Sequence, residues 1–272
     1  MENYLQKEII RLVGLDIYCE YLINEKPPIL LIHGFVSSTY TFKNLIPLLS
    51  KDFSVIALDL PGFGKSEKSK TFVYTFENYS KVITACIEHF RLNNVTIVGH
   101  SMGGQVALYA AKHQPEKINK LVLLCSSGYL KPARKPLVYF TYLPFSRYMM
   151  EKYIRRRDWR KAVENILFDH QHITEELMEE FTRPFQDKHF YTSLVRLLRY
   201  REGDLSSSQL KTIQTPTLLI WGREDKVVPV SIGQKLADDL PYSRLITYER
   251  TGHLVTKERT HDVYNEIIAY AK

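Results

Sequence analysis

The sequence has few cysteines, and that scarcity excludes two common kinds of protein. Cys19, Cys86 and Cys125 are the only three among 272 residues, and none forms a CxxC pair. An odd number of widely spaced cysteines does not suit a disulfide framework. No group of His, Cys, Asp and Glu has metal-ligand spacing. We therefore expect reduced thiols in the core, no bound metal and no other cofactor.

Long apolar runs are also missing. A membrane-spanning helix needs about 18 or more consecutive apolar residues, and the chain has no such stretch. The first residues, MENYLQKEIIRLVG, are too charged for a secretory signal. Hydrophobic residues make up 44% and charged residues 25%, a balance typical of globular proteins rather than disordered ones. These features predict a cytoplasmic globular protein.

Short apolar runs indicate a buried parallel sheet. Runs this short that are almost entirely apolar suit strands covered by helices on both faces. Eight strands are expected, at residues 8–13, 16–21, 29–32, 54–58, 95–98, 121–124, 217–220 and 244–247. Helical spacing of apolar residues lies between several of them, at residues 40–49, 76–90, 102–113, 232–240 and 260–271. The alternation predicts a doubly wound α/β fold with a mostly parallel eight-stranded sheet and helices on both faces.

The alternation stops in residues 128–205. This stretch contains aromatic and charged helical patterns but no convincing strand. We interpret it as a helical insertion after the sixth strand. The expected domains are a core formed by residues 1–127 and 206–272, and the insertion itself.

A nucleophile motif follows one of the expected strands. Residues 99–103 read Gly-His-Ser-Met-Gly, a G-x-S-x-G pattern between the strand at 95–98 and the helix from Met102. A sharp strand-to-helix turn of this kind exposes a serine in a strained backbone, and its neighbours two positions away must be small. The helix N-terminus adds free N–H groups for a developing oxyanion. Ser101 is therefore the candidate nucleophile.

A serine nucleophile needs a base and an orienting acid. In this arrangement the chain order is nucleophile, acid, histidine. Asp225 follows the strand ending at Ile220 and His253 follows the strand ending near Tyr248, so both are expected at the carboxyl edge of the sheet. We assign His253 as general base and Asp225 as orienting acid; Glu224 is the alternative to Asp225.

The loop after the strand at 29–32 supplies further candidates. His33 is expected to hold this loop, and the backbone N–H of Phe35 is expected to join that of Met102 in an oxyanion hole. Residues 59–66 contain two glycines, but they lack the spacing of a phosphate-binding loop. There we predict a tight loop in which Asp59 accepts hydrogen bonds from nearby backbone.

Together these motifs resemble the α/β-hydrolase superfamily over nearly the whole chain. The matching residues are His33–Phe35, Asp59–Ser66, Gly99–Gly104, Gly222–Pro229 and Gly252–His253, in the family's order. The resemblance implies a helical cap, formed by residues 128–205, over a pocket that contains Ser101. Its capped members include carboxylesterases, haloperoxidase-like esterases, carbon–carbon bond hydrolases, epoxide hydrolases and haloalkane dehalogenases.

Differences within the family favour an esterase. Epoxide hydrolases and dehalogenases have an aspartate where this chain has Ser101. Carbon–carbon bond hydrolases are similar through Ser101–Gly104, but usually have asparagine at position 100 and tryptophan at position 254, here His100 and Leu254. The resemblance implies a carboxylesterase acting on a small to medium, largely apolar ester. The alternatives are a carbon–carbon bond hydrolase of a dienoic diketone and a non-enzymatic ligand receptor.

The excess of basic over acidic residues is concentrated in one stretch of the chain. The net charge is +7, and residues 131–161 contain ten Lys or Arg but only Glu151 and Asp158 as acids. Seven aromatic residues share this stretch: Tyr139, Phe140, Tyr142, Phe145, Tyr148, Tyr153 and Trp159. We expect the aromatics to line the pocket roof and the basic run 155–157 to be solvated. Peripheral contact with an anionic membrane is the alternative, whereas no nucleic-acid-binding module is present.

Overall fold

The computed structural model describes residues 5–272 and contains one eight-stranded sheet. The strands lie in the order β1-β2-β4-β3-β5-β6-β7-β8. The two hairpin strands at the first edge are antiparallel, and β4 onward run parallel. Strand bounds are β1 (Gln6–Leu12), β2 (Leu15–Leu22), β3 (Pro28–Ile32), β4 (Ser54–Leu58), β5 (Val95–His100), β6 (Ile118–Leu124), β7 (Thr217–Gly222) and β8 (Ser243–Tyr248). This confirms the fold class and the eight strands expected from the apolar runs.

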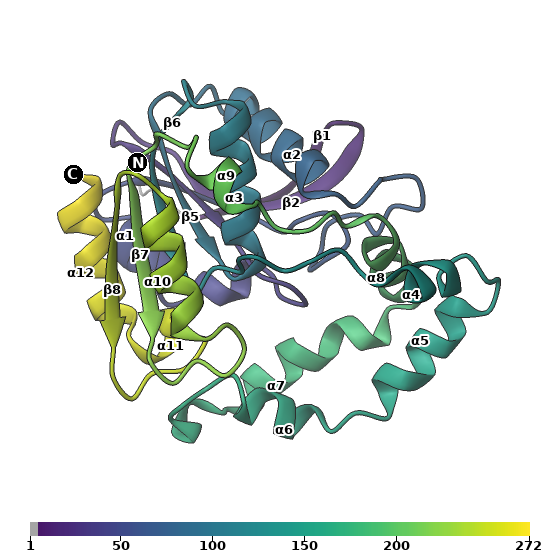
Figure 1. Ribbon diagram of the computed structural model, residues 1–272. Coiled ribbons are helices and arrows are strands. Elements are labelled where there is room, and N and C mark those ends of the chain that lie inside the picture. Colours follow the sequence, from purple (N-terminus) through teal and green to yellow (C-terminus); the bar gives the residue numbers. More distant parts are fainter. Residues whose placement is uncertain (1–4) are drawn as a thin grey trace.

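Helices cover both faces of the sheet (Figure 1). In that view α3 and α10 lie in front of the sheet and α1 lies behind it. The helices outside residues 128–205 are η1 (Thr39–Phe42), α1 (Ile46–Leu49), α2 (Phe76–His89), α3 (Met102–His113), α9 (Ser207–Leu210), α10 (Val230–Asp239), α11 (Val255–Glu258) and α12 (Thr260–Ala271). Strands β3 to β7 are almost completely buried between them, because their side chains are apolar on both faces.

One expected helix is wrong. Residues 40–49 do not form a continuous helix but two short turns, η1 and α1. Pro47 lies in the first turn of α1, where its missing N–H is harmless, and deeper in a helix it would remove a hydrogen bond. The proline therefore requires the helix to start anew at Ile46.

Residues 128–205 contain helices and connecting turns. The helices are α4 (Lys135–Phe140), α5 (Ser146–Arg155), α6 (Trp159–Glu164), η2 (His170–His172), α7 (Glu175–Thr182), η3 (Arg183–Gln186) and α8 (Lys188–Tyr200). Figure 1 shows α4 to α8 as a group beside the sheet, with α5, α6 and α7 farthest from β1 and β2. Across the described chain, 5–272, no helix combines the length and hydropathy needed to cross a bilayer.

The two ends of this helical segment are tied together. The Leu130 carbonyl accepts a hydrogen bond from the Asp204 N–H at 2.7 Å, and the Asp204 carboxylate accepts one from the Leu130 N–H at 3.1 Å. Arg201 also donates to the carbonyl of Lys131. The chain therefore enters and leaves this segment at one place, where residues 130–131 and 201–204 are held side by side.

Candidate active site

Ser101 lies at the turn between β5 and α3 with an unusual backbone conformation. Its φ is 53° and its ψ is −120°, a combination that costs a serine on the order of 1–3 kcal/mol. Hydrogen bonds of 3.0 Å hold the turn: the Ser101 N–H donates to Leu124, and the Ser101 carbonyl accepts from Gly104 and Ser127. The surrounding backbone thus determines the strained conformation and directs the serine out of the sheet.

Three glycines allow the backbone to approach this turn. A Cβ atom on Gly103 would lie 2.2 Å from the carbonyl oxygen of Ile32, and one on Gly99 would lie 2.5 Å from that of Gly103. A Cβ on Gly34 would lie 2.9 Å from Cβ of Ser101. The small residues of the motif are therefore required by close packing between the turn and the loop after β3.

His253 and Asp225 form a buried pair at the carboxyl ends of β8 and β7. His253 Nδ1 lies 2.7 Å from Oδ2 of Asp225, and the other carboxylate oxygen accepts 2.8 Å hydrogen bonds from the amides of Val227 and Val228. All of these bonds fix the carboxylate and the ring relative to each other. Glu224, the alternative acid, instead accepts a hydrogen bond from the Thr251 amide.

The helical segment helps to hold the histidine loop. The His253 N–H donates to the carbonyl of Ile166 at 2.7 Å. Glu258 accepts hydrogen bonds from the amide of Gly252 with one oxygen and from the amides of Phe168 and Asp169 with the other. Sequence reasoning missed Glu258 and Ile166, because their partners lie far away in the chain.

The other two histidines near the site are held neutral. Burial lowers the pKa of His33, and burial together with the nearby His253 lowers the pKa of His100 to about 3. His33 accepts from the Leu60 amide through Nε2 and donates to the Gly34 carbonyl through Nδ1, so it holds the loop as expected. His100 donates through Nε2 to the His253 carbonyl at 3.0 Å.

Cys125 lies behind the buried pair. Potential ligand atoms of Cys125, Asp225 and His253 all lie within 4.8 Å of one another. Burial raises the pKa of the Cys125 thiol well above its usual value, so it stays protonated. Asp225 is already occupied by His253 and two amides, which leaves a donor set better suited to a hydrogen-bond network than to a metal ion.

Two amides are available beside Ser101. Within the described chain, neither the Phe35 N–H nor the Met102 N–H donates to a backbone or side-chain acceptor. Phe35 and Met102 both line the same cavity as Ser101. Ser127, which the sequence analysis did not single out, also lines it and has a buried hydroxyl without a protein partner in residues 5–272.

The cavity has a volume of about 590 Å³ and a largely apolar wall. Its lining comes from loops and helices of the core and from the helical segment, and includes Val228, Ile232, Ile154, Trp159, Phe185 and Leu194. Its two charged side chains, Arg157 and Arg201, have protein partners: Arg157 lies over the Tyr153 ring, and Arg201 binds the Lys131 carbonyl. The wall therefore favours an apolar ligand.

One expectation about the cavity is largely wrong. Of the seven aromatic residues in 139–159, only Tyr153 and Trp159 line it. Tyr139, Tyr142, Phe145 and Tyr148 are exposed instead. Helices α4 and α5 turn these side chains away from the core, while Phe185 of η3 stacks on Trp159 with ring centroids 4.1 Å apart.

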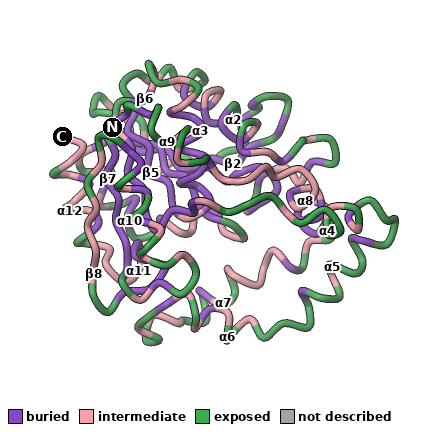
Figure 2. The backbone as a smooth tube through the Cα atoms, viewed as in Figure 1, coloured by how far each residue is buried: buried purple, intermediate pink, exposed green. Residues whose placement is uncertain are grey.

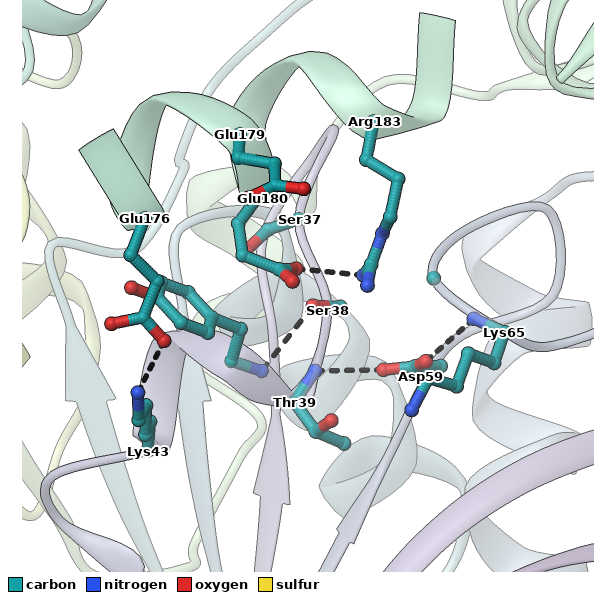
Figure 3. A network of polar contacts seen from close by, with 12 residues as sticks. Ser37, Ser38, Thr39, Lys43, Asp59, Lys65, Glu176, Glu179, Glu180 and Arg183 are labelled. Atoms are coloured by element: carbon teal, nitrogen blue, oxygen red, sulfur yellow. Dashed lines mark hydrogen bonds and ion pairs between the residues drawn. The ribbon is translucent and has the colours of Figure 1, made fainter. Parts of the chain in front are cut away.

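One ion pair joins α7 to Lys43, the residue after η1, and a second links α7 to η3 (Figure 3). Glu176 pairs with Lys43, and Glu180 pairs with Arg183 at 2.7 Å. Beneath them Asp59 accepts 2.7 Å hydrogen bonds from the amides of Thr39 and Lys65, which confirms the tight loop predicted for residues 59–66.

Comparison with known proteins places the chain in a family. The sequence model described as "alpha/beta hydrolase fold" matches residues 27–201, and that of the TAP-like proteins matches residues 200–271. The chain belongs to the α/β-hydrolase fold family. Its sheet order, its strained Ser101 turn and its buried histidine–aspartate pair are all consistent with a hydrolase of this fold.

Individual relatives cover nearly the whole hydrolase. The uncharacterized hydrolase YugF of Bacillus subtilis is 42% identical over 95% of both chains. A 2-hydroxy-6-oxononadienedioate/2-hydroxy-6-oxononatrienedioate hydrolase of Pseudomonas putida is 26% identical over 89% of this chain and 87% of its own. Among solved structures, a 2-hydroxy-6-oxo-6-phenylhexa-2,4-dienoate hydrolase of Rhodococcus has a TM-score of 0.83 at 22% identity over 98% of each chain.

Replacement of Gly103 tests the close approach at the turn. Gly103→Ala should lower the free energy of unfolding by roughly 3 kcal/mol or more, because the new methyl group would collide with the backbone of β3. Gly14→Ala is the control: at φ 79° with nothing within 4 Å of the added Cβ, it should lose only about 1–2 kcal/mol. Urea unfolding measures both. Equal losses would contradict the packing argument.

Proposed function

We propose that this hydrolase cleaves carboxylic esters with an apolar acyl group through an acyl-enzyme on Ser101. The observation that carries the proposal is the apolar cavity of about 590 Å³ that Ser101 lines. Transfer of an acyl chain from water into such an apolar cavity is favourable. The helices of residues 128–205 act as a cap, since they supply much of the lining.

The proposed reaction needs only residues of this chain. Ser101 Oγ attacks the ester carbonyl carbon while His253 Nε2 takes the hydroxyl proton, and Asp225 stabilises the resulting imidazolium. The Phe35 and Met102 amides donate to the oxyanion. As the intermediate collapses, His253 returns the proton to the leaving alcohol. Water then attacks the acyl-enzyme and gives a proton to His253. His253 passes that proton to Ser101 Oγ as the bond between Oγ and the acyl carbon breaks, which releases the acid and restores Ser101.

The hydrogen bond between Asp225 and His253 supports this assignment of roles. Because the carboxylate faces Nδ1, the neutral ring carries its proton there and leaves Nε2 free to act as a base. Both ring nitrogens of the neutral His33 contact backbone groups. Nε2 of the neutral His100 donates to the His253 carbonyl, and its Nδ1 is buried without a partner among residues 5–272. Of the histidines in residues 5–272, only His253 lies within ion-pair distance of a carboxylate.

Carbon–carbon bond hydrolysis of a dienoic diketone is the second candidate. It is favoured by several relatives at 25–28% identity that are named as hydrolases of 2-hydroxy-6-oxo dienoic compounds. The same three side chains would serve both reactions, so substrate recognition decides between them. A ketone with an acidic group would need a cation in the cavity. Arg201 is bound to protein groups, so Arg157, which has no acidic partner among residues 5–272, is the cation that would meet it.

Direct comparison of substrates tests the function. The protein should hydrolyse p-nitrophenyl esters, with kcat/KM rising with acyl length until the cavity is filled, and should leave a dienoic diketone intact. Ser101→Ala should reduce ester hydrolysis by roughly 10⁴-fold or more, because the three side chains act as a unit. Preferential cleavage of the diketone would move the assignment to carbon–carbon bond hydrolysis.

Replacement of each neighbouring carboxylate by its amide tests which residue orients His253. Asp225→Asn should lower kcat by roughly 10⁴-fold, because the amide favours the histidine tautomer with its proton on the wrong nitrogen. Glu224→Gln is the matched control and should change kcat by less than about tenfold, since its amide oxygen can still accept from Thr251. The reverse order of effects would make Glu224 the acid.

A further inference from the structure

The net positive charge of the protein is concentrated in one part of the helical segment. Ten of the 37 Lys and Arg but only two of the 30 Asp and Glu fall in residues 131–161, so the rest of the chain is close to neutral. All ten basic side chains are exposed. Within the described part of the chain, only Arg155 and Arg160 pair with an acidic side chain.

Large apolar side chains are exposed in the same place. Phe145 is 71% exposed, and Tyr142 and Leu143 accompany it in the turn between α4 and α5. Figure 2 shows that most residues of α5 are exposed and that the helix lies away from the sheet. Exposed apolar side chains of this size seldom cluster without a binding partner.

On α5 the basic and apolar residues share one face. Tyr148, Met149, Lys152, Tyr153 and Arg156 are spaced at helical intervals and are all exposed; we call them the α5 face. A shallow hollow of about 360 Å³ is lined by four of them together with Arg157. Tyr153 and Arg157 line both this hollow and the cavity that contains Ser101, so the two are adjacent.

We propose that the α5 face and the adjoining turn bind the surface of an anionic phospholipid bilayer. Lys152 and Arg156 would meet lipid phosphates while Tyr148, Met149 and Phe145 enter the boundary between headgroups and acyl chains. Cations attract an anionic surface, and apolar side chains gain by leaving water. Docking in this orientation brings the hollow, and beyond it the cavity, to the lipid.

Other partners fit this surface less well. A symmetric dimer through the α5 face would bring the same cations of two copies together, which costs free energy. A nucleic acid would satisfy the cations but would leave the aliphatic Met149 and Leu143 without an apolar contact. A bilayer surface satisfies both kinds of side chain.

Sedimentation with vesicles tests the proposal. Ser101→Ala protein, used to prevent lipid hydrolysis, should bind vesicles of equal parts phosphatidylcholine and phosphatidylglycerol, and not phosphatidylcholine alone. Binding should weaken as salt rises, because the attraction is screened. Lys152→Glu with Arg156→Glu should weaken binding about 30-fold or more, taking on the order of 1 kcal/mol for each basic residue. Phe145→Ser should weaken it at any salt concentration.

Matched controls distinguish the effect of this surface from a general effect of net charge or of losing an exposed aromatic ring. Lys51→Glu with Lys70→Glu makes the same change in net charge at exposed positions elsewhere, and Tyr242→Ser removes an aromatic ring that is 61% exposed outside the helical segment. Both should bind vesicles like the parent. Thermal unfolding checks that each variant is folded.

Three results would overturn the proposal: no binding to the anionic vesicles at low salt, equal weakening by the control variants, or binding to a short DNA duplex but not to vesicles. Hydrolysis of a soluble ester by the unmodified protein is measured separately. Ester hydrolysis without vesicle binding would reject membrane docking and leave the proposed function standing, whereas the reverse would reject only the proposed function.

Discussion

The conformation of the backbone at Ser101 depends on how closely the turn after β5 can approach the loop after β3. Gly103 lies against the carbonyl of Ile32, and Gly34 lies against Ser101 itself, so neither position has room for a side chain. The bonds from Ser101 to Leu124, Gly104 and Ser127 then fix the strained φ of 53°. This arrangement puts Ser101 beside the amides of Phe35 and Met102, which have no acceptor among residues 5–272.

The histidine is positioned from the other side, and the helical segment takes part. The His253 amide bonds to Ile166, and Glu258 links Gly252 to Phe168 and Asp169. Together with the Lys43–Glu176 pair, these contacts join the segment to the His253 loop and to the residue that follows η1. A movement of α6 or α7 would therefore change the position of His253 as well as the shape of the cavity wall. This coupling gives the proposed cap a second role beyond lining the cavity.

Much of the sheet could be predicted from sequence, because strands buried on both faces require apolar runs, and each run ends where the chain reaches the sheet edge. Asp225 and His253 could be placed at that edge for the same reason.

The sequence could not distinguish Asp225 from Glu224 as the acid, because the two residues are neighbours after β7. In the fold their side chains point in different directions, Asp225 to His253 and Glu224 to the Thr251 amide. Contacts such as that of Glu258 with Phe168 join segments 90 residues apart and have no local signal. The exposure of the aromatic residues of α4 and α5 could not be predicted, because apolar composition does not reveal which face of a short helix meets the core.

Covalent labelling tests directly whether Ser101 is the nucleophile. The folded protein would be treated with a fluorophosphonate, digested, and mapped by mass spectrometry. We expect one phosphonylated residue, Ser101, with no label on the Ser101→Ala protein. Modification of Ser127 or another residue instead, or an unlabelled wild-type protein that is shown to be folded, would contradict this expectation.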